Sequence, residues 1–307
     1  MNAIWSFTGL PIITFPTGTD NHNLPYSVQI VGRFGRDESL LNISRYLHQA
    51  IGVGELPLAW TVVLPYSKSM DHIGLFAKDM PTMAATLPVL VTDWQNNKDL
   101  LANKPIIGVP MGSYIDLTMP QVRAQFEMII DAIKHTDAIV KPIILCDDIA
   151  SHNDTHDLIA NAELYQIHKS WIKNYWEIYK PMSRAALEFG QNVSNKILME
   201  SLNKARKVQS WMQQLMVEHA IDAWIAPVAP DLAPKGIGST GDFRMNAIWS
   251  FTGLPIITFP TGTNNQNLPY SVQIVGRFGR DESLLSISRY LHQAIGVSEL
   301  PLAWSLE

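Results

Sequence analysis

Short apolar runs alternate with amphipathic stretches along the middle of the chain. Three runs, Ile106 to Val109, Ala138 to Cys146 and Ala223 to Pro227, are mostly apolar and are bounded by polar residues. Runs of this kind are typical of buried strands. The stretches between them repeat their apolar residues at helical spacing. This alternation predicts an α/β fold in which a mixed sheet is flanked by helices.

Two of the predicted helices have recognisable beginnings. Asp79 is placed to cap a helix that reaches Val91, with Pro81 in its first turn. Thr118 is placed to cap a second helix over residues 120–136. The face of this helix that we expect to be buried carries Val122, Phe126, Ile129, Ile130 and Ile133.

Two long stretches, 155–179 and 183–219, are also predicted to be helical and are separated by Lys180-Pro181. A polar stretch precedes them, and we interpret it as a turn in which Asp154 or Thr155 caps the next helix. This turn gathers four side chains of metal-binding types, but helix capping explains it more simply than a metal site. The four residues are His152, Asp154, His156 and Asp157.

Residues 1–60 recur almost letter for letter as residues 245–304. Only four of the sixty positions differ, namely Asp20/Asn264, His22/Gln266, Asn42/Ser286 and Gly54/Ser298. Repeat architectures need at least about three tandem units, whereas here two copies flank an unrelated stretch. The pattern therefore indicates a rearranged gene and not a solenoid.

Each copy predicts two strands followed by a helix. In the first copy, Pro11 to Phe15 and Tyr26 to Gly32 have the composition of strands, and Asp37 is placed to cap the helix. The whole apolar stretch from Ile4 to Phe15, and its twin at 248–259, is interpreted as buried strand.

One fold has one place for this segment, and we expect the second copy to take it. The second copy follows the strand at 223–227 after a short connecting loop, and the closure of a short loop costs little conformational entropy. The first copy is expected to dock loosely, because a segment of about 60 residues buries too little surface to be stable alone. The predicted organisation is a duplicated segment at 1–60 and a main domain at 62–307.

Composition and charge exclude several classes of protein. The 307 residues are 47% hydrophobic and 17% charged, which is enough for a sizeable core. The net charge of −5, without a basic stripe, argues against a nucleic-acid partner. No apolar run approaches the roughly 18 residues of a membrane helix. The single cysteine, Cys146, excludes an internal disulfide and fits the reducing cytoplasm.

Four stretches, in order, resemble the amidase signature family, whose members hydrolyse carbon–nitrogen bonds in amides. The first reads Leu-Pro-Tyr-Ser-Lys-Ser-Met-Asp-His-Ile-Gly, after which Leu75 replaces the family's usual proline. The resemblance covers roughly residues 62–304 and implies the C-terminal half of such an enzyme. The four stretches are Leu64 to Gly74, Asp222 to Asp242, Asn246 to Gly262 and Leu268 to Leu285.

The family's catalytic residues have no counterpart here. Its members use a Ser–cis-Ser–Lys triad that lies before the segment matching Leu64. In this sequence the repeated segment precedes Leu64, and no Gly-Gly-Ser-Ser-Gly-Gly stretch occurs. The resemblance therefore implies no catalytic residue, no metal and no cofactor. It places six residues beside the substrate site: Ser69, Asp71, Gly74, Thr240, Asp242 and Trp249.

Other candidates for chemistry have simpler explanations. Ser67 and Lys68 are neighbours on an extended chain and should point apart, while Ser67 and Ser69 share a face without a base between them. Ser239, between Gly238 and Gly241, has no base beside it in the sequence and lies in a turn. The aromatic residues Trp171, Tyr175, Trp176 and Tyr179 recur at helical spacing, which is typical of packing in a core or between helices. The resemblance offers an alternative, in which one of them lines the substrate site.

The sequence thus predicts a truncated amidase-family protein that is inactive by itself. The resemblance implies a small amide as the substrate of the family reaction. A first alternative is a non-catalytic partner of an intact amidase, and a second is a mis-assembled record of an active amidase. The exposed strands of the first copy make a homo-oligomer or a swapped dimer a further expectation. Neither nucleic acid nor a membrane is expected as a partner.

Overall fold

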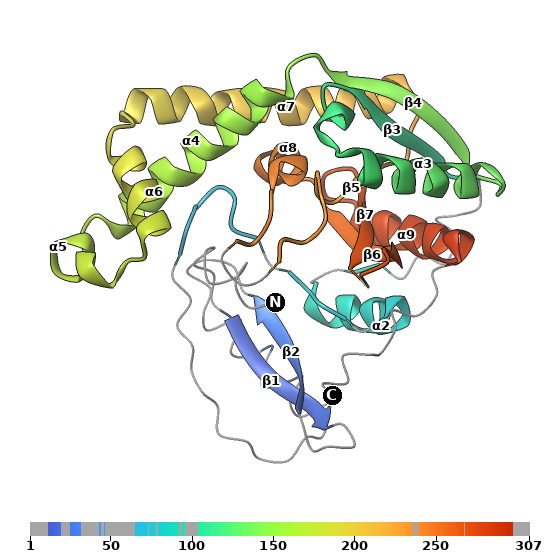
Figure 1. Cartoon of the computed structure of the whole chain (residues 1–307), viewed down its shortest axis with the longest axis horizontal. Coiled ribbons are helices and arrows are strands. Elements are labelled where there is room, and N and C mark those ends of the chain that lie inside the picture. Colours follow the sequence, from blue (N-terminus) through green and yellow to red (C-terminus); the bar gives the residue numbers. More distant parts are fainter. Residues whose placement is uncertain are drawn as a thin grey trace. The chain divides into compact units, whose positions relative to one another are not determined.

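The strands form two separate sheets. In the computed structural model (Figure 1), β1 (Ile12–Thr19) and β2 (Pro25–Val31) form a two-stranded sheet, and five other strands form a mixed sheet. Only the backbone is described in β1 and β2. The structure describes residues 12–19, 25–31, 43, 46, 65–72, 74–77, 79–91, 94–95, 104–235, 239–266 and 268–296.

The five-stranded sheet has the order β4-β3-β5-β7-β6. β3 pairs in parallel with β4 and with β5, whereas β7 pairs antiparallel with β5 and with β6. The α/β class, the mixed sheet and the three strands predicted in the middle of the chain are therefore confirmed. The strands are β3 (Ile106–Gly112), β4 (Ile139–Cys146), β5 (Ala223–Pro227), β6 (Ile256–Thr263) and β7 (Pro269–Val275).

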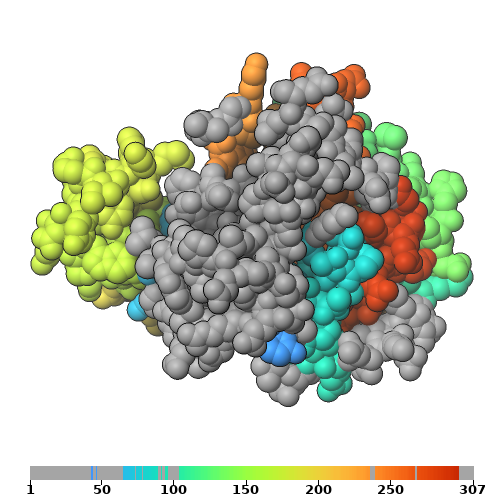
Figure 2. Space-filling model, turned by 90° about the horizontal axis from the view of Figure 1, so that it is seen from below, coloured from blue at the N-terminus to red at the C-terminus, as the bar shows by residue number. Residues whose placement is uncertain are grey.

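Two helices, α3 (Pro120–Lys134) and α9 (Asp281–Ile295), pack against each other and against strands of this sheet. The five apolar residues predicted for the buried face of α3 are all buried. α9 buries Leu284, Leu285, Ile287, Ser288 and Leu291, and part of its outer face is visible in red in Figure 2. Both helices follow the amphipathic pattern that a helix on a sheet requires.

The chain divides into two compact units. The first contains residues 1–94 and 157–200, and the second contains residues 95–156 and 201–307. Two of the three boundaries fall inside α4 and α7, and the third lies between Trp94 and Gln95. Within the described residues the remaining helices are α2 (Met80–Leu90), η2 (Ile115–Leu117), α4 (Ile149–His168), α5 (Ile172–Tyr175), η3 (Trp176–Ile178), α6 (Pro181–Gln191), α7 (Asn195–Glu218) and α8 (Arg244–Thr252). None of the described helices is long and apolar enough to cross a membrane.

The predicted beginning of the helix after Asp79 is correct. The side chain of Asp79 accepts a hydrogen bond from the backbone N–H of Thr82 at 2.8 Å and caps α2, with Pro81 in the first turn. The predicted break at Lys180-Pro181 is also found, since α6 begins at Pro181. The two long helical stretches predicted on either side of it are each divided, because α4 ends at His168 and α6 ends at Gln191. The first backbone N–H groups of a helix have no partner within the helix. A capping carboxylate accepts a hydrogen bond from one of them, and a proline in the first turn has no N–H to leave unpaired.

The predictions for Thr118, Asp154 and Thr155 are wrong. Thr118 ends the short helix η2, because its hydroxyl donates to the carbonyl of Ile115 at 2.6 Å, and α3 begins after Met119 without a side-chain cap. The supposed turn at 152–157 lies inside α4, which begins at Ile149. Thr155 donates to the carbonyl of Ser151, the i–4 bond that lets a threonine remain inside a helix.

The second copy of the repeat begins with a helix that the sequence interpretation missed. Residues 248–252 belong to α8, and the strand β6 starts only at Ile256. Gly253 ends α8 in the left-handed conformation at φ 67°, as glycine does at many helix ends. α8 is buried on nearly all sides, so its apolar run lacked the amphipathic period by which helices are recognised.

Candidate functional site

The segment 65–72, which carries the first amidase-like motif, forms a tight turn in the first unit. The carbonyl of Ser67 accepts hydrogen bonds from the backbone N–H groups of Met70 at 3.2 Å and Asp71 at 2.8 Å. Ser67 is buried while Lys68 is exposed, so their side chains diverge as the sequence predicted. We call residues 65–72 the serine turn.

A single carboxylate oxygen from α4 fixes this turn. Glu163 Oε2 accepts hydrogen bonds from Ser67 Oγ at 2.5 Å, Ser69 N at 2.9 Å and Ser69 Oγ at 2.8 Å. The Glu163 side chain is buried, and a buried carboxylate must be compensated by such donors. The expectation that no base lies between the two serines is therefore wrong, because Glu163 lies there.

Tyr66 and Asp71 add a second connection at the same turn. The N–H of Tyr66 donates to Asp71 Oδ2 at 3.2 Å, and the Tyr66 hydroxyl donates to Asn161 Oδ1 on α4 at 3.2 Å. Burial raises the pKa of Tyr66 to about 12. Burial also raises the pKa of Asp71 to about 6, with a smaller contribution from the charge of Glu163.

His168, at the end of α4, binds the beginning of the turn. Its Nε2 lies 2.8 Å from the carbonyl oxygen of Pro65, and its Nδ1 lies 2.6 Å from the hydroxyl of Tyr179. Burial lowers the pKa of His168, which favours the neutral ring. A neutral ring that donates from Nε2 to the carbonyl accepts the tyrosine proton at Nδ1, so both nitrogens are satisfied.

The hydrogen bonds described above hold the serine turn in position. The Ser67 hydroxyl is 2% exposed and is held by Glu163, so it does not meet an external acyl group in this arrangement. Among the described residues, no lysine amine hydrogen-bonds a hydroxyl of the serine turn. A nucleophilic serine needs both access and a positioned base. Ser67 lacks access, whereas Ser69 is exposed and is hydrogen-bonded to Glu163. The described contacts of the serine turn hold it in place.

A serine and a lysine do meet elsewhere, in the second unit. Lys204 Nζ donates to Ser151 Oγ at 2.8 Å and to the Ser151 carbonyl at 3.2 Å. The N–H of Ser151 is already used, because it donates to Asp148 Oδ1 at 3.1 Å. A lysine that donates to both a carbonyl and a hydroxyl ties α7 to the start of α4, which is a structural role.

The six residues predicted to lie beside the substrate site fall into two groups. Ser69 and Asp71 share the serine turn, and Gly74 follows it in the same unit. Thr240, Asp242 and Trp249 belong to the second unit. Ser69 and Asp71 have hydrogen bonds within the first unit, and Asp242 and Trp249 have hydrogen bonds within the second.

In the second unit, Asp242 and Trp249 have well-defined partners, while Thr240 is exposed. The Arg244 guanidinium donates to Asp242 at 2.8 Å and, by these hydrogen bonds, lowers the pKa of that carboxyl. Trp249 is fully buried, and its Nε1–H donates to the Tyr114 hydroxyl at 2.9 Å. That hydroxyl donates in turn to the carbonyl of Met245 at 2.8 Å, so one oxygen joins α8 to the segment after β3.

The remaining candidates do not form a reactive site in the described residues. Ser239 Oγ accepts a hydrogen bond from the N–H of Gly241 at 3.1 Å, the geometry of a turn, while Gly238 lies outside those residues. Within the same part of the chain, no group of three metal-ligating side chains converges. His152 stacks instead between Trp211 and Phe251, with ring centroids 6.4 and 6.2 Å away.

The aromatic stripe is not part of a core. Trp171 is 36% exposed and Tyr175 is 54% exposed, and none of the residues in α5 or η3 is buried. Trp171 and Tyr179 instead make edge contacts with the His168 ring, and Arg184 lies over the Trp176 ring at 5.4 Å. Helical spacing was misleading here, because the helix stops after one turn.

Sequence reasoning missed the residues of α4 that hold the serine turn: Asn161, Glu163 and His168. A signal for Glu163 was present, since it lies one helical turn after Ile159 on a face that also carries Ala160. A carboxylate on a buried face needs a partner from elsewhere in the chain. Its partners are about 95 residues away in sequence, so no local pattern identifies them.

A family model supplies the decisive comparison. The model for amidases matches residues 53–285, which is most of the chain. The chain belongs to the amidase family. Its resemblance to the amidase signature, its α/β class and its mixed sheet agree with this membership.

Sequence relatives are components of an amidotransferase. The chain is 32% identical over 114 residues to the A subunit of glutamyl-tRNA(Gln) amidotransferase from a Ruegeria species, covering 33% of this chain and 23% of that protein. It is 24% identical over 278 residues to the corresponding protein of Wolinella succinogenes, covering 76% and 61%. The chain thus spans less than two thirds of the length of these relatives.

Solved structures share the fold. An amidase crystal structure matches with a TM-score of 0.63 and 18% identity, covering 94% of this chain and 59% of that one. A structure described as an unexpected vestigial protein complex, which reveals the origins of an s-triazine catabolic enzyme, matches with a TM-score of 0.65 and 17% identity, covering 78% and 56%. At these identities the likeness concerns the fold alone.

Proposed function

We propose that this chain is the scaffold portion of an amidase-family carbon–nitrogen hydrolase and that it does not hydrolyse amides by itself. The single observation that carries the proposal is the serine turn, whose two hydroxyls are both bound to Glu163. The absence of a Gly-Gly-Ser-Ser-Gly-Gly stretch from the sequence supports it. In this proposal the family's Ser–cis-Ser–Lys triad is missing from the chain.

The serine turn then serves as a preorganised wall beside the site where a complete family member binds a small amide. Three contacts to Glu163, with others from Asn161 and His168, hold it without any substrate. Rigid support of this kind is what a catalytic loop needs from its neighbours. Ser69, Asp71 and Gly74 are the residues we assign to this supporting role.

The test is an assay of the purified chain for ammonia release from a panel of small amides. We expect no turnover above the uncatalysed rate. Ser67→Ala, Ser69→Ala and Ser151→Ala serve as matched variants, since each removes one candidate hydroxyl. Turnover that any one of these variants abolishes, with the fold retained by circular dichroism, would overturn the proposal.

A second candidate function is a non-catalytic partner of an intact amidase. The comparisons favour it, because the sequence relatives are named as subunits and one structural relative is described as a vestigial protein complex. Co-expression with a full-length amidase that carries the triad should give a complex of the two chains. Separate elution of the two chains at micromolar concentration would remove this candidate.

The repeated segment raises two further questions. We place this chain in the cytoplasm and expect that it can form a swapped dimer. Light scattering should then give twice the mass of one chain, and deletion of residues 1–60 should reduce the mass to that of one chain.

A long-read sequence of the locus and its transcript tests whether the junction at Thr61 and Val62 is real. A continuous frame that instead carries a glycine-rich serine loop before Val62 would make the chain a mis-assembled record of an active amidase.

A further inference from the structure

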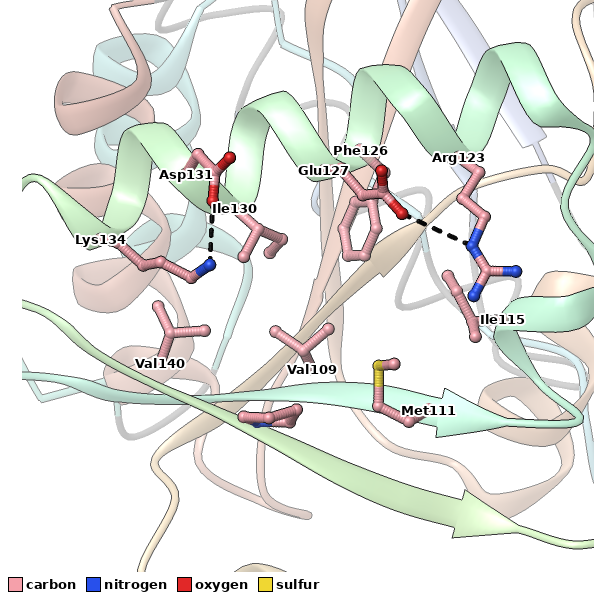
Figure 3. A pocket seen from close by; sticks show the side chains of 11 residues that line it. Val109, Met111, Ile115, Arg123, Phe126, Glu127, Ile130, Asp131, Lys134 and Val140 are labelled. Carbon is pink, nitrogen blue, oxygen red and sulfur yellow. Dashed lines mark hydrogen bonds and ion pairs between the residues drawn. The ribbon is translucent and has the colours of Figure 1, made fainter.

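A groove in the second unit lies between α3 and the edge of the sheet formed by β3 and β4 (Figure 3). Its volume is about 360 Å³, within the range of roughly 300–1,000 Å³ that is usual for small-molecule sites. The floor is apolar. Val109 and Met111 of β3, Val140 of β4, and Phe126 and Ile130 of α3 point into it.

The floor is only partly covered. On β4, Ile143 and Leu145 are buried, whereas Val140 is half-buried and Pro142 is exposed. β4 is the edge strand of its sheet in the described part of the chain, so no neighbouring strand shields this side. The groove therefore presents apolar surface to solvent at the place where α3 leaves the edge strand uncovered.

A row of charged side chains from α3 follows the rim. Arg123 pairs with Asp116 at 3.2 Å and with Glu127 at 3.6 Å, while Lys134 pairs with Asp131 at 2.9 Å. Figure 3 shows the two cations toward the ends of the row and the two carboxylates of Glu127 and Asp131 between them. Asp116 does not line the groove, and the four charges that do line it, two cations and two carboxylates, balance.

The order of these charges decides which ligand the groove fits. Glu127 and Asp131 are one helical turn apart, and like charges at this spacing repel each other. A ligand cation placed between them would relieve that repulsion. A ligand anion would have to displace Asp116 or Glu127 from Arg123, which already has two carboxylate partners.

We propose that this groove binds an organic ammonium compound, with the apolar body on the floor of β3 and β4 and the amine between Glu127 and Asp131. The proposal is independent of amide hydrolysis, because it uses none of the residues of the serine turn. It also gives the groove a chemistry that can be tested with simple probes.

The probes are n-octylamine, 1-octanol and octanoate, which share an alkyl chain and differ in the charge of the head group. Calorimetric titration of the whole chain at neutral pH and low salt should give affinities in the order octylamine, octanol, octanoate. The preference for octylamine should shrink as salt is added, because the rim charges are exposed to solvent. Equal or tighter binding of octanoate would overturn the assignment of a cationic ligand.

Variants locate the binding. Val140→Phe fills the groove from a half-buried position and should weaken octylamine about tenfold or more, as one step of about 1.4 kcal/mol would. Met128→Phe makes a similar enlargement on α3, at a residue that is 65% exposed and does not line the groove, and should leave the affinity unchanged. Equal effects of the two variants, or none, would show that the amine binds elsewhere.

Charge variants test the rim. Glu127→Gln should weaken octylamine about two- to fivefold, the range of an exposed ion pair, and leave octanol unchanged. Lys134→Gln removes a cation from the same rim and should strengthen octylamine binding. Changes of the same sign in both variants would contradict the electrostatic assignment, and an absence of saturable binding by all three probes would remove the site.

Discussion

The two copies of the repeat give a controlled comparison of one sequence in two surroundings. The hairpins have the same register, with Ile12 opposite Val31 in the first copy and Ile256 opposite Val275 in the second. Both also have an irregularity at the same place, after Pro16 and after Pro260. A pairing that recurs so closely is encoded within the hairpin itself.

The surroundings of the two copies differ. β7 pairs with β5 and so joins a five-stranded sheet, whereas β1 and β2 form a two-stranded sheet. Ile287 is buried in α9, while its twin Ile43 is half-buried; Tyr290 is half-buried, while its twin Tyr46 is 60% exposed. Local sequence thus specifies the hairpin, and the rest of the chain determines how deeply these residues of the following helix are buried.

The largest expected effect comes from Ile274→Ala, compared with Ile30→Ala in the first copy. Ile274 is completely buried, so its truncation should cost about 2–5 kcal/mol of unfolding free energy. Ile30→Ala should cost well under about 1 kcal/mol, because the first copy is expected to dock loosely. Urea denaturation of the two variants measures both. Equal losses would show that the two copies are packed alike.

A smaller difference is expected for Trp249→Phe and Trp5→Phe. The first change removes the hydrogen bond from Trp249 Nε1 to the buried Tyr114 hydroxyl and should cost about 1–3 kcal/mol. The second change should have almost no effect. The double variant Trp249→Phe with Tyr114→Phe separates the hydrogen bond from the change in packing. The comparison would fail if Trp5→Phe were as costly as Trp249→Phe.

Asp71 lies in neither copy of the repeat, so the pH dependence that it gives to stability serves as a reference for the comparison. Its folded pKa of about 6 lies above the ordinary unfolded value near 4, so its contribution to stability is complete below about pH 4 and is lost as pH rises through 6. After a discount for its partial exposure, this amounts to about 1–2 kcal/mol. Asp71→Asn should flatten the change in stability over this range, measured by denaturation at several pH values. An unchanged profile would mean that Asp71 is not buried as described.

Deletion of residues 1–60 should have a smaller effect still. A loosely docked segment contributes little, so the melting temperature should fall by less than about 2–4 °C, the shift expected for 1 kcal/mol in a domain of this size. Deletion of residues 245–304 is the matched control and should prevent cooperative folding. A large fall after the first deletion would show that the first copy is integrated into the fold.

Local signals predicted most of the sheet and helices of this chain, including the buried face of α3 and the cap at Asp79. They failed where tertiary contacts outweigh local preference. α8 has no amphipathic period because it is buried on nearly all sides. Thr118 donates its hydroxyl to the Ile115 carbonyl of the preceding helix instead of accepting from an N–H of α3. The motif located the serine turn, but the glutamate that holds it comes from a distant helix, which only the folded chain brings near.

Both outer strands of the five-stranded sheet contain a proline, Pro142 in β4 and Pro260 in β6. A proline has no N–H to offer an incoming strand, so each rim of the sheet interrupts the ladder that a growing filament would need. The first copy of the repeat carries the same feature, since Pro16 stands in β1, one of the two strands of its sheet. Along β1, therefore, the repeated sequence also carries a residue that opposes fibre growth.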